Sequence, residues 1–154
     1  MVAIVVLAHR PLATALIEAA RHVYSRDPCL ASRYLTGMDI APDADVATAL
    51  AQARTLVLAA DQGNGVLVLT DMLGATPGNV AAQLAVDGQV AVIAGVNMPM
   101  LLRALCYGQS DLATLVAKAA AGAAAGVQQI AASAANPGGA GASAPAPTPA
   151  PARR

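Results

Sequence analysis

The chain has 154 residues, enough for one domain with a substantial hydrophobic core but not for two of ordinary size. Nine basic and nine acidic residues give zero formal net charge and a pI of about 6.7, so charge gives no reason to expect nucleic acid or an anionic membrane as a partner. No apolar run reaches the roughly 18 to 20 residues of a membrane span, which predicts a protein without direct membrane insertion.

The first half of the chain alternates strand and helix patterns. Residues 2–8 are continuously apolar and typical of a buried strand, and residues 11–24 carry apolar side chains at helical spacing, with Pro11 suited to a first turn. A weaker strand is predicted at 33–38, a turn and helix start at 39–45, and a helix from about 44 to 58. His9 therefore lies between a strand end and a helix start.

The second half repeats this alternation. A loop at 61–65 leads into a strand at 66–70, and Thr76 and Pro77 are suited to the N-cap and first residue of a helix that carries Val80 and Leu84. A strand at 89–95, a loop at 96–100, helices at 101–106 and 111–121, and a short last strand within 122–130 follow. The pattern predicts a three-layer α/β/α fold around a mostly parallel four-stranded sheet.

The composition changes near residue 131 to Ala, Pro, Gly and Ser, which cannot bury a core. We expect a folded domain over residues 1–132 and a disordered tail over residues 133–154. Cys29 and Cys106 match no metal-ligand or redox spacing, so two reduced thiols in a cytoplasmic protein are expected.

Polar side chains follow three of the predicted strands. In an open parallel sheet, ligands gather beyond the carboxyl ends of the strands, where His9, Asp71 and Asn97 are expected. A carboxylate at position 71 that accepts a hydrogen bond from one ring nitrogen of His9 would leave the other nitrogen nucleophilic. The helix start at residues 74–78 favours anions, which indicates phosphoryl transfer through histidine. From the pattern alone, a purely structural His–Asp pair remains an open alternative.

Three motifs occur in order: a histidine directly after the first strand, the segment from Asp71 to Asn79, and the segment from Gly95 to Leu101. Their combination resembles the IIA components of the mannose-class bacterial phosphoenolpyruvate:sugar phosphotransferase system, over roughly residues 1–130. The resemblance implies a phosphotransferase in which His9 accepts a phosphoryl group from the histidine-containing phosphocarrier protein and passes it to a IIB component on a separate chain. Asp71 would orient His9, and no metal or cofactor would be required.

The resemblance also implies a homodimer in which residues 126–130 form a strand in the partner's sheet. Positions expected to stabilise the phosphoryl group are Gly74, Ala75 and Thr76; those expected to dock partner proteins are Arg10, Asn97, Met98, Pro99 and Met100. The chain departs from the family pattern at three places: Arg10-Pro11 follows the histidine where Gly is usual, Ala75 replaces a second Gly, and Gly78 stands where a larger residue is common. Arg10 is alternatively a ligand of the phosphoryl group.

Two other functions remain open from the sequence. The chain is alternatively a regulatory module whose phosphorylation controls protein binding without sugar transport, or the phosphodonor subunit of a dihydroxyacetone kinase. His22 is expected to be a solvated or capping residue, and Asp39, Asp43 and Asp61 are expected at turns or helix caps rather than as acid catalysts.

Overall fold

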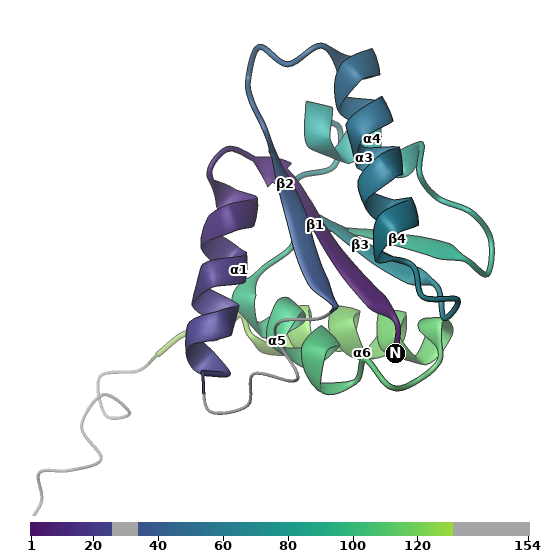
Figure 1. Ribbon diagram of the computed structural model, residues 1–154. Helices are drawn as coiled ribbons and strands as arrows, with labels where there is room; N and C mark the ends of the chain where they lie inside the picture. Colours follow the sequence, from purple (N-terminus) through teal and green to yellow (C-terminus); the bar gives the residue numbers. More distant parts are fainter. Residues whose placement is uncertain (26–33, 131–154) are drawn as a thin grey trace, which may run out of the picture.

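The computed structural model of the protein describes residues 1–25 and 34–130 (Figure 1). Its four strands are β1 (Ala3–His9), β2 (Leu35–Ile40), β3 (Val66–Thr70) and β4 (Val90–Ala94). Its helices are α1 (Leu12–Val23), α3 (Val46–Ala60), α4 (Thr76–Ala82), α5 (Met98–Cys106) and α6 (Leu112–Ala125). The strands form one sheet in the order β2-β1-β3-β4, and every neighbouring pair is parallel. The predicted α/β fold with a four-stranded parallel sheet is therefore confirmed.

The sheet lies between two layers of helices, which Figure 1 shows on its opposite sides. Strand β1 is central and alternates between the two faces, so Ile4 and Val6 pack towards α1, α5 and α6, while Val5 and Leu7 pack towards α3 and α4. All four side chains are at most 1% exposed. This burial on both faces explains why the strand is continuously apolar.

The register of the sheet places the end of β1 beside the residues that follow β3. The pairing of β1 with β3 runs from Ala3 and Val66 to Leu7 and Thr70, whereas the pairing of β1 with β2 continues to His9 and Ile40. Strand β1 thus extends two residues past its last partner in β3. Consequently His9 reaches the segment that begins at Asp71.

Several element boundaries differ from the sequence predictions. Strand β2 includes Asp39 and Ile40, which were expected in a turn, because Ile40 is 2% exposed and packs in the core under α3. Helix α5 begins at Met98 rather than at residue 101, since the Asn97 side chain caps it and Pro99 fits its first turn. Helix α4 does not use Thr76 as its cap: Ala75 occupies that position, without a side-chain hydrogen bond.

Helix α6 is longer than predicted and replaces part of the expected last strand. It continues through Gly122 to Ala125, and residues 127–130 form no strand in the described part of the chain. Val127 and Ile130 are 77% and 78% exposed. The expected exchange of this segment in a dimer stays a prediction. The predicted tail at 133–154 lies outside the described residues.

Candidate functional site

His9 is the last residue of β1, at the carboxyl edge of the sheet. The preceding six residues of the strand are buried, and the His9 side chain is 39% exposed, so the chain emerges from the core at this residue. Three parallel strands end around it, because β1 lies between β2 and β3. The imidazole is therefore held by a rigid sheet and is open to solvent on part of its surface.

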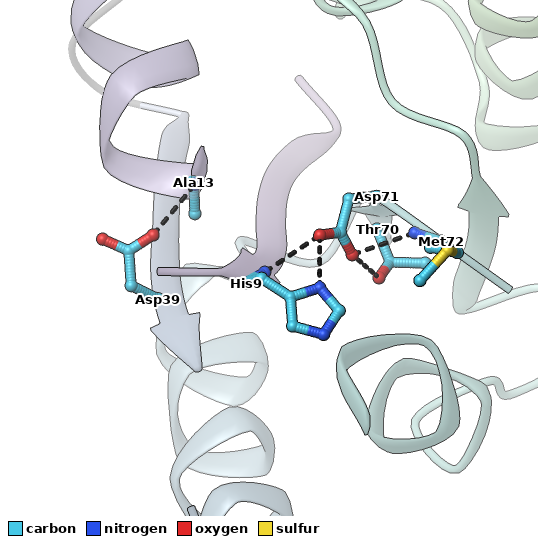
Figure 2. A network of polar contacts seen from close by, with 6 residues as sticks. All are labelled: His9, Ala13, Asp39, Thr70, Asp71 and Met72. Carbon is cyan, nitrogen blue, oxygen red and sulfur yellow. Dashed lines mark hydrogen bonds and ion pairs between the residues drawn. The ribbon is translucent and has the colours of Figure 1, made fainter. Parts of the chain in front are cut away.

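Asp71 directly follows β3 and binds His9 twice through a single oxygen (Figure 2). Its Oδ2 accepts a hydrogen bond from the His9 backbone N–H at 3.0 Å and lies 2.7 Å from Nδ1 of the ring. The second oxygen, Oδ1, accepts from the Met72 backbone N–H at 2.9 Å and from the Thr70 hydroxyl at 3.5 Å. Both oxygens are thus fixed, and the predicted meeting of His9 and Asp71 is what the structure shows.

This geometry selects one tautomer of His9. A carboxylate only accepts hydrogen bonds, so Nδ1 carries the proton that is donated to Asp71. The other nitrogen, Nε2, then keeps its lone pair, and it points away from Asp71 in Figure 2. A neutral imidazole with one bare nitrogen is a nucleophile, and the adjacent carboxylate stabilises the positive charge that the ring gains when Nε2 forms a bond.

Asp71 stays ionised at neutral pH. Its side chain is 12% exposed, and this burial alone would raise the pKa of the carboxyl group. Hydrogen bonds from the His9 backbone N–H, the His9 ring and the Met72 N–H, together with the charge that the ring carries when it is protonated, outweigh burial and hold the pKa of Asp71 below its ordinary value of 3.8. In the His9–Asp71 pair, Asp71 is therefore the ionised carboxylate.

A lowered pKa predicts how the stability of the fold depends on pH. The ionised Asp71 stabilises the folded chain above pH 3.8, and this contribution is lost as the pH falls through the still lower folded value. We expect the difference in unfolding free energy between wild type and Asp71→Asn to be constant near neutral pH and to shrink below pH 3.8. Denaturant unfolding of both proteins at several pH values measures this difference in unfolding free energy. A difference that grew on acidification would contradict the assignment.

The loop after Asp71 leads into α4 through the predicted phosphoryl-stabilising residues. Gly74 has a φ of +83°, a left-handed conformation that favours glycine, and Ala75 is the N-cap of α4. Thr76 is the first helical residue. The following Pro77 has no N–H to offer, so backbone donors here come from its neighbours. Stabilisation of a phosphoryl group by this helix start stays a prediction.

The predicted docking segment 97–100 proves to be the first turn of α5. The Asn97 side chain accepts from the Met100 N–H at 2.9 Å and donates to the Ala123 carbonyl at 3.4 Å, so it ties α5 to α6. Met100 is 2% exposed and belongs to the core, which leaves it no surface for a partner. Met98 and Pro99 are half-buried. Docking through these two residues and Asn97 stays a prediction, while Asn97 also caps α5 and Met100 packs in the core.

Four other residues singled out in the sequence lie at the surface. Arg10 is exposed beside His9, and His22 is exposed on α1. Asp61 accepts from the N–H groups of Gly63 and Gly65 in a turn. Cys106 is a free thiol with its Sγ 2.7 Å from the Tyr24 hydroxyl, whereas Cys29 lies outside the described residues.

The sequence interpretation missed two apolar side chains beside the pair. Met72 and Leu73 directly follow Asp71, yet they are 56% and 80% exposed. Large apolar side chains that project into solvent next to a reactive group are typical of a contact surface. In the sequence, the position of these two residues between the end of a buried strand and a glycine could have identified them as exposed.

Two further features bear on the kind of site. Within residues 1–25 and 34–130, no three His, Cys, Asp or Glu side chains cluster as ligands of a metal ion would. None of the helices in this part of the chain has the length and apolar character needed to cross a membrane.

The fold and the site together define a parallel α/β protein with a histidine–aspartate pair at the carboxyl edge of its sheet. The family described as the phosphotransferase system (PTS) fructose IIA component, EIIA-man, matches residues 3–121. The chain belongs to this family, whose members are phosphotransferase carriers.

Individual relatives agree with this assignment. The mannose-specific EIIAB component of the PTS from Escherichia coli K12 is 35% identical over 75 residues, which are 48% of this chain and 23% of that protein. The matched segment thus spans about a quarter of the curated relative. Phosphotransferase system component EIIA from Streptococcus agalactiae has a TM-score of 0.73 at 22% identity, covering 84% of this chain and 97% of that one. The mannose/sorbose specific IIA subunit from Enterococcus faecalis has a TM-score of 0.71 at 20% identity, with 84% and 95% covered. At these identities, the two structures support the fold.

Proposed function

We propose that this chain is a cytoplasmic phosphocarrier that accepts a phosphoryl group on Nε2 of His9 from the histidine-containing phosphocarrier protein and passes it to a IIB partner. The observation that carries the proposal is the 2.7 Å contact between Nδ1 and Asp71, which leaves Nε2 as the nucleophile. Membership of the IIA family supports the reaction class.

The proposed transfer needs no change in the protonation of the protein. The lone pair of Nε2 attacks the phosphorus atom while the bond from phosphorus to the donor nitrogen breaks, and Nδ1 keeps its proton. The ring gains one positive charge, which Asp71 balances. In the second step the acceptor attacks the same phosphorus and the bond to Nε2 breaks, which returns His9 to its neutral form.

The phosphoryl oxygens must be stabilised near the Asp71 carboxylate, which repels them. We propose that backbone donors around Gly74, Ala75 and Thr76 supply this stabilisation. The exposed guanidinium of Arg10 is the alternative ligand, and the rate of transfer to Arg10→Ala separates the two: a normal rate assigns the task to the loop.

Labelling tests the proposal. The protein is mixed with phosphoenolpyruvate, enzyme I and the phosphocarrier protein, and acid-labile phosphate is measured. Wild type and His22→Ala should be labelled equally, because His22 is exposed on α1 away from the pair, whereas His9→Ala should stay unlabelled. Unlabelled wild type, or a labelled His9→Ala variant, would refute the function.

The same labelled protein identifies the acceptor. It is incubated separately with a IIB component and with the acceptor subunit of a dihydroxyacetone kinase. Loss of label to IIB supports the sugar pathway, and loss to the kinase subunit supports the second function. If neither removes the label, the proposed transfer to IIB is wrong and a regulatory role is favoured.

We propose that partner proteins dock on the apolar surface formed by Met72 and Leu73. Leu73→Ser should raise KM for the phosphocarrier protein, with little change in stability, because the side chain is 80% exposed. Leu58→Ser is the matched control: Leu58 is 77% exposed near the end of α3, which leads to the opposite edge of the sheet. Equal KM values for wild type and Leu73→Ser would exclude this surface.

The dimer is also a proposal. Apart from a single antiparallel bridge between Val86 and Val90, β4 pairs with β3 alone in the described chain, so most of its other edge is unpaired. The exposed segment 127–130 is available to add a strand there in a second copy. Sedimentation equilibrium should give the mass of two chains. The mass of one chain would contradict the exchange.

A further inference from the structure

We propose that Asp39 is a positioning residue for phosphoryl transfer at His9, an inference that rests on the proposed function. Asp39 lies in β2 beside Ala8 of β1. Its Oδ1 accepts from the backbone N–H groups of Ala13 at 2.9 Å and Thr14 at 3.3 Å, and its Oδ2 accepts from the Thr14 hydroxyl at 2.5 Å. A carboxylate on a neighbouring strand therefore caps the first turn of α1.

Helix α1 has no capping side chain at its own N-cap position, and Asp39 takes that role. Pro11 occupies the N-cap position and makes no side-chain hydrogen bond to the helix. The first N–H groups of a helix need an acceptor, and an acidic side chain also offsets the helix dipole. Because Asp39 belongs to β2, its hydrogen bonds provide acceptors for the first N–H groups of α1. The same hydrogen bonds fix the start of α1 relative to the sheet.

The segment that carries His9 is held from both sides. On the β3 side, the His9 N–H donates to Asp71 at 3.0 Å. On the β2 side, the Arg10 N–H donates to the Ile40 carbonyl at 3.1 Å, and Asp39 holds the helix that follows. Figure 2 shows the two aspartates on opposite sides of the end of β1.

The connection between His9 and the capped helix is two residues long, Arg10 and Pro11. A shift of the first turn of α1 is therefore transmitted to the backbone of His9 with little chain to absorb it. Loss of the Asp39 cap should loosen the ring and lower the occupancy of the Nδ1 hydrogen bond to Asp71. Transfer reactions are sensitive to such displacements, because the nucleophile must lie in line with the bond that breaks.

The test compares Asp39→Ala with Asp111→Ala. Asp111 also caps the first turn of a helix, α6, and accepts from the Thr114 N–H and hydroxyl at 2.8 Å each. It lines a cavity with Gly65 and Gln89, next to the starts of β3 and β4, at the edge of the sheet opposite His9. Because each variant loses one aspartate cap, an effect that comes only from lower stability should appear in both variants.

We expect Asp39→Ala to lower kcat for phosphorylation by roughly 10- to 100-fold at an unchanged KM. Nitrogen NMR of the free protein should show that His9 no longer keeps its proton on Nδ1 alone. Asp111→Ala should keep the wild-type rate and spectrum. Asp39→Asn, which retains an oxygen acceptor for the N–H groups, should restore much of the rate.

Two results would overturn the positioning role: a rate for Asp39→Ala no lower than that for Asp111→Ala, or an unchanged His9 spectrum. Should Asp39→Ala not fold, Thr14→Val removes only the hydroxyl contact and should change the spectrum in the same direction. If wild type accepts no phosphate, the proposed function fails instead. The NMR comparison then still decides whether Asp39 orients the ring.

Discussion

Asp71→Asn is expected to slow phosphorylation of His9 by roughly 100- to 10,000-fold while the fold stays intact. Asparagine has nearly the same shape, but its amide lacks the negative charge that balances the phosphorylated ring. Its NH₂ group can also donate to Nδ1, which would place the ring proton on Nε2 and remove the nucleophile. Rapid-mixing measurements of label transfer give the rate, and circular dichroism checks the fold.

Asp43→Asn is the matched control for this variant, because Asp43 is exposed in the loop before α3. It should transfer phosphate at the wild-type rate. An Asp71→Asn variant as fast as this control would show that the hydrogen bond to Nδ1 is structural only.

Gly78→Ala is expected to lower both the stability of the fold and the rate of transfer. A Cβ at position 78 would lie 2.3 Å from the Met72 carbonyl oxygen and 3.4 Å from the Leu73 Cα, so the backbone of the loop must move. Overpacking of this kind costs about 1 to 3 kcal/mol of unfolding free energy. Because Met72 directly follows Asp71, the displacement also disturbs the carboxylate, and chemical denaturation with a rate assay measures both effects.

Gly108→Ala is the control for this second variant. A Cβ there would meet the flexible side chain of Met1 at 3.2 Å, which can move aside. Gly108→Ala should change neither the unfolding free energy nor the rate of transfer appreciably. Wild-type stability and rate in Gly78→Ala would show that the loop has more freedom than its close packing indicates. The larger side chains expected at this position in the family require a different path of the loop.

The sheet and the His9–Asp71 pair were predictable because both depend on local patterns. Apolar runs with β-branched residues identify buried parallel strands, and polar residues directly after them must lie at one edge of the sheet. The order of the strands then makes β1 and β3 neighbours, which brings His9 to Asp71. The distance of 2.7 Å between Nδ1 and Oδ2 could not be derived from the sequence, since it depends on register and side-chain rotamers.

The remaining features depend on contacts between distant segments. Asp39 resembles a turn residue in the sequence, but it caps a helix that begins 27 positions earlier, at Leu12, and is part of a strand. Met100 resembles a loop residue, but the Asn97 cap draws it into α5 and the core. Residues 127–130 have a strand-like composition, yet a strand needs a partner, and these residues pair with no strand in the described part of the chain.

Phosphoryl transfer through Nε2 of His9 is tested most directly by determining which nitrogen carries the phosphate. Phosphorus and nitrogen NMR of the phosphorylated protein should show a phosphoryl group on Nε2 of His9, with Nδ1 still protonated and hydrogen-bonded to Asp71. A phosphoryl group on Nδ1 of His9, or on any other residue, would contradict the account.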